Sequence, residues 1–151
     1  MPTSSWGPST WELFHTLVSK IKEEEKDNSK FIKGLLFEIQ NLCANLPCPY
    51  CSKHSMEYFK KNSKEMNNVN TKEKIIIFMF NFHNNVNKSL NKKEFINSNL
   101  VIYDNKNTAQ VFNIFYSRWS ASTSGMLNYV KRSKLGIFHS WLLSHKDKFD
   151  V

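Results

Sequence analysis

Two cysteines, Cys48 and Cys51, are separated by only two residues in the segment Cys48-Pro49-Tyr50-Cys51. This spacing lets the two sulfur atoms close a disulfide within one helical turn. Pro47 disfavours continuation of a preceding helix, which places Cys48 at the start of the next one. The unpaired N–H groups of a helix N-terminus stabilise a thiolate, the form of cysteine that attacks a disulfide. The pair is therefore predicted to be redox-active.

The same cysteines allow two other interpretations. Cys43, Cys48, Cys51 and His54 together offer three sulfurs and one nitrogen, a ligand set that zinc accepts. Their spacing matches none of the common zinc modules, and Cys43 falls on an apolar helical stripe, where free cysteines commonly sit in the core. The third interpretation is two core cysteines that happen to be close. We expect no metal.

A second group of side chains lies on both sides of the cysteines in the sequence. Trp11 and His15 are four residues apart, so they share one face of a helix. His83 and Asn87 have the same spacing, with Asn84 between them, on a stretch that is otherwise apolar. Buried imidazole and amide groups need hydrogen-bond partners. Either they satisfy one another inside the core, or they meet a planar heteroaromatic ligand whose phosphates reach the nearby lysines, Lys88, Lys92 and Lys93.

Helices are the elements that must position these residues. Apolar positions at helical spacing predict helices over 7–21, 31–43, 48–61 and 71–87. The run 75–80 also suits a strand, but the pattern continues past strand length, which favours helix. A polar loop is expected over 62–70, a short turn followed by an extended piece over 94–104, and two further helices over 108–119 and 127–144. The fold class predicted is all-α.

Composition bounds the function further. The chain has 151 residues, 40% of them hydrophobic, and a formal net charge of +8. Its basic residues are spread out, and no recognised nucleic-acid motif accompanies them, so nucleic acid is not the expected partner. The longest apolar run, 75–80, is too short to span a bilayer, and residues 1–6 have no secretory pattern. We expect no membrane association and a cytosolic protein, where a Cys-X-X-Cys pair is redox-active or metal-binding.

Three blocks resemble the Erv/ALR family of FAD-linked sulfhydryl oxidases. The first is Trp6-Gly7-Pro8-Ser9-Thr10-Trp11-Glu12-Leu13-Phe14-His15, similar to the opening helix of that family. The second is Leu46-Pro47-Cys48-Pro49-Tyr50-Cys51-Ser52-Lys53-His54, similar to its active-site turn. The third is His83-Asn84-Asn85-Val86-Asn87-Lys88-Ser89-Leu90-Asn91-Lys92, similar to its flavin-binding signature. Each block alone is a weak signal, but their order and separation over residues 6–95 are specific.

The resemblance implies a four-helix bundle that holds FAD in its mouth, followed by a short fifth helix. It implies a thiol oxidase in which Cys48 exchanges disulfides with a substrate dithiol and Cys51 forms the charge-transfer thiolate against the flavin ring. Oxygen would reoxidise the flavin and leave as hydrogen peroxide. The residues that would line the cofactor are Gly7, Trp11, His15, His54, His83, Asn84, Asn87 and Lys92.

The chain departs from the family in lacking a second, shuttle pair of cysteines, since only Cys43 remains. Electrons would then come directly from the dithiol of a partner protein, such as a thioredoxin-like one. The resemblance also implies a homodimer, and is greatest to short members from large cytoplasmic DNA viruses, acting in the host cytoplasm or on virion proteins. It covers a core of residues 1–97. Residues 98–151 are expected to form a helical extension packed on that core or on a dimer partner.

Overall fold

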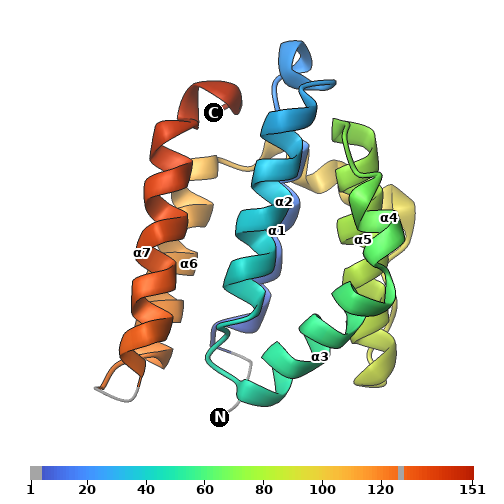
Figure 1. Cartoon of the computed structure of the whole chain (residues 1–151). Coiled ribbons are helices and arrows are strands. Elements are labelled where there is room, and N and C mark those ends of the chain that lie inside the picture. The colour runs from blue at the N-terminus through green and yellow to red at the C-terminus, as the bar shows by residue number, and fades with distance from the viewer. Residues whose placement is uncertain (1–4, 126–127) are drawn as a thin grey trace.

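The computed structural model describes residues 5–125 and 128–151, and these form an all-helical protein. Figure 1 shows three layers: α6 and α7 on one side, α1 and α2 in the middle, and α3, α4 and α5 on the other side. The only β-type pairing in the described ranges is an isolated antiparallel bridge between Ile21 and Phe149. The prediction of an all-α fold built on a helical bundle is confirmed.

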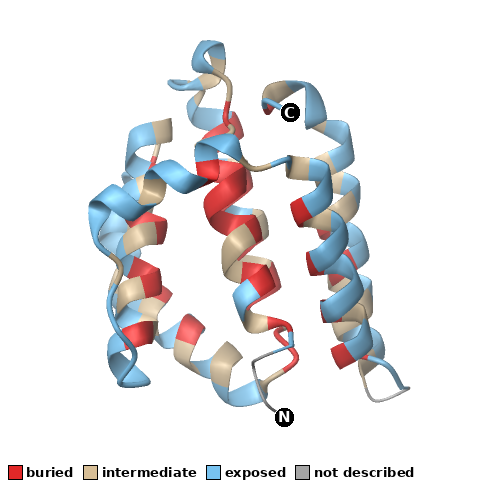
Figure 2. Ribbon diagram, turned by 180° about the vertical axis from the view of Figure 1, so that it is seen from behind, coloured by how far each residue is buried: buried red, intermediate tan, exposed pale blue. Residues whose placement is uncertain are grey.

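Helix α1 (Gly7–Ser19) lies at the centre of the molecule. Pro8 lies in its first turn, and the hydroxyls of Ser9 and Thr10 both donate to the Trp6 carbonyl, at 3.0 and 2.7 Å. Its consecutive residues from Leu13 to Val18 are all buried, so partners cover α1 on more than one face. Figure 2 shows the inward surfaces of the surrounding helices buried as well.

Three further helices complete the bundle expected from the sequence: α2 (Ser29–Cys43), α3 (Pro49–Lys61) and α5 (Lys72–Ser89). Asn28 caps α2 by accepting from the Phe31 N–H at 3.1 Å, and Thr71 caps α5 by accepting from the Lys74 N–H at 3.2 Å. The ambiguous run 75–80 is helical, as predicted.

Two connections differ from the prediction. The expected polar loop over 62–70 contains a short helix, α4 (Ser63–Asn67), which is followed by the buried Val69. The expected extended piece over 94–104 is instead largely a 3-10 helix, η2 (Asn97–Asn105), with Tyr103 buried. Each segment has one buried side chain, Val69 just after α4 and Tyr103 within η2, and short helices depend on tertiary context more than on propensity.

The last two helices, α6 (Thr108–Ser122) and α7 (Tyr129–Ser144), pack on the bundle within the same chain. Helix α6 lies against α1, and α7 lies against α2. Phe115, Trp119 and Phe138 are among the largest fully buried side chains of the protein. Gly34 of α2 lies so close to α7 that an added Cβ would stand 3.3 Å from the Trp141 ring.

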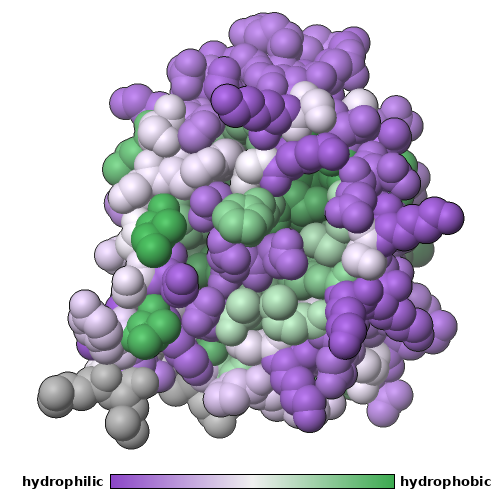
Figure 3. All heavy atoms as spheres, in the orientation of Figure 1, coloured by the Kyte–Doolittle hydropathy of each residue, from purple (hydrophilic) through white to green (hydrophobic). Residues whose placement is uncertain are grey.

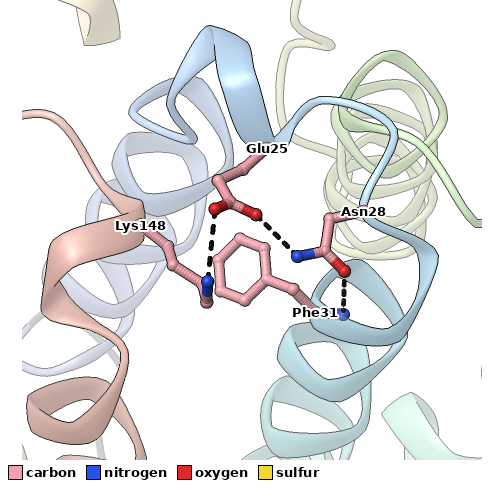
Figure 4. Close-up of polar contacts among 4 residues, drawn as sticks. All are labelled: Glu25, Asn28, Phe31 and Lys148. Atoms are coloured by element: carbon pink, nitrogen blue, oxygen red, sulfur yellow. Dashed lines mark hydrogen bonds and ion pairs between the residues drawn. The ribbon is translucent and has the colours of Figure 1, made fainter.

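Polar contacts hold the C-terminal segment against the beginning of α2 (Figure 4). Lys148 pairs with Glu25 at 3.2 Å, and Glu25 accepts from the Asn28 side chain at 2.6 Å. The Lys148 ammonium also lies 5.9 Å from the centre of the Phe31 ring. A 3-10 turn between the first two helices, η1 (Glu23–Glu25), carries this acidic partner. In Figure 3 hydrophilic residues crowd this end of the molecule, while hydrophobic residues gather over the middle of the face.

None of the helices within residues 5–125 and 128–151 is long and apolar enough to cross a membrane.

Candidate functional site

A cavity of about 550 Å³ opens where α1, α3, α5 and η2 meet. Both cysteines of the pair line it, together with six of the residues expected to contact a cofactor: Gly7, Trp11, His54, His83, Asn87 and Lys92. The three sequence blocks, which are far apart along the chain, therefore converge on one site. His15 and Asn84 are not part of the cavity wall.

The cysteine pair sits at the start of α3, as the sequence predicted. Cys48 is the N-cap residue, and its sulfur accepts a hydrogen bond from the Cys51 N–H at 3.1 Å. The Leu46 N–H donates to the Ser52 hydroxyl at 2.8 Å, which fixes the turn that enters the helix. An N–H group of the first turn of α3 thus points at the Cys48 sulfur. Burial and the adjacent Cys48 sulfur raise the pKa of the Cys51 thiol to about 12.

The third cysteine has a different environment. Cys43 lies at the end of α2, is buried, and burial raises the pKa of its thiol, which keeps it protonated. It also lines the cavity. No group of three or more histidine, cysteine, aspartate or glutamate side chains in the described part of the chain could hold a metal ion. The geometry therefore gives no support to a zinc site made by Cys43, Cys48, Cys51 and His54.

An aromatic stack forms the opposite wall of the cavity. The Trp11 and His83 rings are parallel, with an interplanar angle of 4° and centroids 4.0 Å apart. Helices α1 and α5 thus bring together the two polar faces that the sequence suggested. His15 lies behind this stack, and its Nε2 is 2.8 Å from Nδ1 of His83. The two imidazoles satisfy each other, so His15 orients His83 from behind rather than lining the cavity.

Both histidines are held neutral by their surroundings. Burial lowers the pKa of His15 to about 4. Burial, with smaller contributions from His15 and Lys92, lowers the pKa of His83 to about 3. In the neutral pair one ring nitrogen donates and the other accepts, and this arrangement fixes complementary tautomers. Protonation of both rings would leave two donors facing each other.

Acid should therefore destabilise the fold before the carboxylates titrate. Below pH 6.5 the unfolded chain binds protons at His15 and His83, while the folded chain does not until about pH 4 and 3. The free energy of unfolding should fall between pH 7 and pH 5 by about 2 kcal/mol for each buried histidine. Denaturant titrations followed by circular dichroism at several pH values would measure this slope.

A matched control uses Thr16, the buried neighbour of His15, which carries no titratable group. We expect His15→Gln to flatten the dependence of the unfolding free energy on pH, whereas Thr16→Val should leave it unchanged. An equal slope in all three proteins would contradict the assignment of acid sensitivity to the buried pair.

The end of α5 explains how Asn84, Asn87 and Lys92 come to the site. Asn91 adopts a left-handed conformation with φ of 56°, and the Lys92 N–H donates to the Asn87 carbonyl at 2.8 Å. This C-terminal motif folds Lys92 back over the helix end, beside Asn87. The Asn84 side chain exchanges two hydrogen bonds with the backbone of Phe95, at 2.7 and 3.0 Å. Asn84 thereby holds the returning segment and places the Phe95 ring 4.8 Å from His83.

Sequence reasoning missed the part of the wall that comes from η2. Tyr103 lines the cavity, stacks on His15 with centroids 5.0 Å apart, and is buried enough to raise its pKa to about 12. Lys106 also lines the cavity and pairs with Glu12 at 3.0 Å. No local sequence pattern identifies Tyr103 or Lys106 as part of the site. The signal that could have been used is Glu12, an acidic residue next to Trp11 on the same helix, because its carboxylate needs a basic partner such as Lys106.

Comparison with known proteins agrees with this site. The model of the Erv1/Alr family matches residues 8–113. An FAD-linked sulfhydryl oxidase of African swine fever virus (isolate Pig/Kenya/KEN-50/1950) is 35% identical over 88 residues, covering 58% of this chain and 70% of the viral protein. The mitochondrial FAD-linked sulfhydryl oxidase of Saccharomyces cerevisiae is 29% identical over 90 residues, covering 59% of this chain and 44% of the yeast protein.

A putative FAD-linked sulfhydryl oxidase of Invertebrate iridescent virus 3 is 27% identical over 89 residues, covering 59% of this chain and 58% of the viral protein. No solved structure matches the chain. The family match covers well over half of the sequence and includes both cysteines, the Trp11–His83 stack and the end of α5. This chain therefore belongs to the Erv1/Alr family.

Proposed function

We propose that the chain is an FAD-linked sulfhydryl oxidase that forms disulfide bonds in protein substrates. The observation that carries the proposal is the single cavity of about 550 Å³ that brings the Cys48/Cys51 pair together with the Trp11–His83 stack and Lys92. The viral and yeast relatives, which are named FAD-linked sulfhydryl oxidases, support the same activity.

The residues of the cavity fit FAD. Its volume is within the range of cofactor and ligand pockets. Flat aromatic side chains suit the two ring systems of the cofactor, and Lys92 and Lys106 supply positive charge for its phosphates. The indole N–H of Trp6, another lining residue, is buried without a hydrogen-bond partner among the described residues, so a polar ligand would satisfy it.

In this mechanism Cys48 receives the substrate. A substrate thiolate attacks the Cys48 sulfur of the oxidised pair, the Cys48–Cys51 bond breaks, and Cys51 leaves with the electron pair. The second substrate thiolate then attacks the substrate sulfur of the mixed disulfide and releases Cys48. The Cys51 N–H, 3.1 Å from the Cys48 sulfur, stabilises the departing Cys48 thiolate. The substrate loses two protons and two electrons.

The chemistry that FAD supplies when bound is acceptance of the two electrons from the reduced pair and their transfer to oxygen, which gives hydrogen peroxide. Both cysteines line the cavity and are half-buried, and the family resemblance assigns Cys51 as the one next to the flavin. His15 holds the His83 ring through the 2.8 Å contact and so keeps the aromatic wall in place. Gly7, His54 and Asn87 complete the part of the wall contributed by the three blocks.

The first measurement is the visible absorption spectrum of the purified protein, before and after addition of a dithiol under air. A flavin spectrum that bleaches and then recovers as oxygen is consumed is the expected result. A colourless protein that neither binds added FAD nor consumes oxygen with a dithiol would contradict the proposal.

The proposal also covers the electron donor, the oligomeric state and the place of action. The electron donor is the dithiol of a partner protein, such as a thioredoxin-like one, because the chain has no second cysteine pair. The enzyme acts as a homodimer, in line with the family resemblance and with exposed apolar side chains such as Phe37 and Ile77. It works in the host cytoplasm or the virion, which the viral relatives support.

The proposed division of the chain is a catalytic core of residues 1–97 and a helical extension of residues 98–151. Packing of α6 on α1 and of α7 on α2 supports an extension that rests on its own core. The family match ends at residue 113, inside α6, so α7 lies beyond it.

A further inference from the structure

The beginning of α7 lies next to the redox-active pair. Lys131, in the first turns of α7, places its ammonium 3.4 Å from the carbonyl oxygen of Pro47, the residue before Cys48. Figure 1 shows that α3 and α7 begin at the same end of the molecule. A helix beyond the family match therefore borders the sulfur that meets the substrate in the proposed function.

Apolar side chains are exposed at the starts of both helices, α3 and α7. Tyr50, between the two cysteines, is 70% exposed, and the first residues of α7, Tyr129 and Val130, are 70% and 58% exposed. Exposed aromatic side chains beside a reactive group are typical of protein contact surfaces. Together with Lys53 and Lys131, these three residues are called the docking face below.

The charged side chains of the docking face, Lys53 and Lys131, are both positive. The sequence contains no aspartate or glutamate in residues 44–56, on either side of the cysteine pair, and none in residues 105–146, which include α6 and α7. The nearest acidic residue of α3 is Glu57, one turn after Lys53. Lys53 is exposed on α3, and Lys131 is half-buried beside Pro47. An acidic partner is attracted to such a surface, and a basic one is repelled, at distances up to about the Debye length of 10 Å.

We propose that the docking face selects protein dithiols whose cysteines are flanked by acidic residues. The aromatic side chains contact the backbone around the substrate cysteines, and Lys53 and Lys131 pair with the flanking carboxylates. The selection rests on the proposed function for its chemistry, but binding to the face does not require turnover. Helix α7, which lies beyond the family match, thus contributes to the selection of substrates by the catalytic core that the chain shares with its family.

The test compares two peptides with the same central Cys-X-X-Cys, one flanked by glutamates and one by lysines. The value of kcat/KM for oxygen consumption should be about tenfold higher for the acidic peptide at low ionic strength, and the ratio should shrink as salt is added. Lys131→Glu should lower the ratio severalfold. Lys64→Glu is the matched control, since Lys64 lies exposed on α4, far from the start of α3, and should leave the ratio unchanged.

Binding gives a second, redox-independent measurement. Fluorescence anisotropy with Ser-X-X-Ser versions of both peptides should show the same preference and the same loss in Lys131→Glu. Equal affinity for the two peptides, or equal effects of Lys131→Glu and Lys64→Glu, would overturn the proposal. Turnover of dithiothreitol, a small uncharged dithiol, distinguishes failure of the oxidase proposal from failure of the docking-face proposal. If dithiothreitol is not oxidised, the oxidase proposal is contradicted. If dithiothreitol is oxidised but the peptides show no charge preference, only the docking face is contradicted.

Discussion

Replacing Cys51 by serine should abolish dithiol-dependent oxygen consumption, lowering kcat by at least about three orders of magnitude. Cys51 lines the cavity with the aromatic stack, and without it Cys48 has no neighbouring cysteine with which to form the disulfide that accepts the electrons of the substrate. A hydroxyl cannot leave as a thiolate does in disulfide exchange. Oxygen uptake with dithiothreitol, at saturating FAD, measures the effect.

Two controls separate loss of chemistry from loss of structure. The Cys51→Ser protein should keep its flavin absorbance, because the serine is smaller than the cysteine and the rest of the cavity wall is unchanged. Cys43→Ala should retain most of the activity while losing some stability, since it removes a buried sulfur. An active Cys51→Ser protein, or a folded but inactive Cys43→Ala protein, would refute the roles given to these cysteines.

Local spacing was enough to predict much of the site. Trp11 and His15 lie one helical turn apart on α1, and His83 and Asn87 lie one turn apart on α5, so each pair had to share a face. The proline before Cys48 and the cap at Thr71 likewise marked helix starts that the structure confirms. These features depend on residues within four positions of one another, which is the range over which a sequence pattern determines geometry.

Contacts between residues far apart in the chain determine the features of the site and fold that local sequence patterns did not predict. Spacing placed His15 and His83 on helix faces, but it did not say that His15 would stand behind His83 with the two nitrogens 2.8 Å apart. Two segments expected to be irregular also contain short helices, and each has a buried side chain, Val69 after α4 and Tyr103 within η2. Both effects come from burial against partners far away in the chain, so no window of local sequence contains them.

The same limit applies to the last third of the chain, whose apolar positions predicted helices but not their partners. Within the chain, Trp119 of α6 is fully buried, and α6 packs on α1. Helix α1 also carries Trp11, which lines the cavity, and His15, which holds the His83 ring. The extension therefore supports the helix that forms one wall of the site.

Trp119→Ala should accordingly destabilise the whole protein by about 3–5 kcal/mol, the usual cost of removing a fully buried aromatic side chain. For a chain of this length that loss corresponds to a fall in Tm of roughly 10 °C. Thermal unfolding followed by circular dichroism, and in parallel by flavin fluorescence, measures both the fold and the site. Tyr116→Ala is the matched control on the same helix, because Tyr116 is 40% exposed and should cost far less.

The decisive observation is whether circular dichroism and flavin fluorescence change at the same temperature, rather than how far the Tm falls. If α6 and the bundle share one core through α1, helix content and flavin release must be lost in a single transition, and Trp119→Ala must lower both midpoints equally. An extension that folds separately would lose its helices first and leave the flavin bound to an intact bundle. The flavin midpoint in Trp119→Ala therefore decides whether residues 98–151 are structural support for the active site or an appended unit.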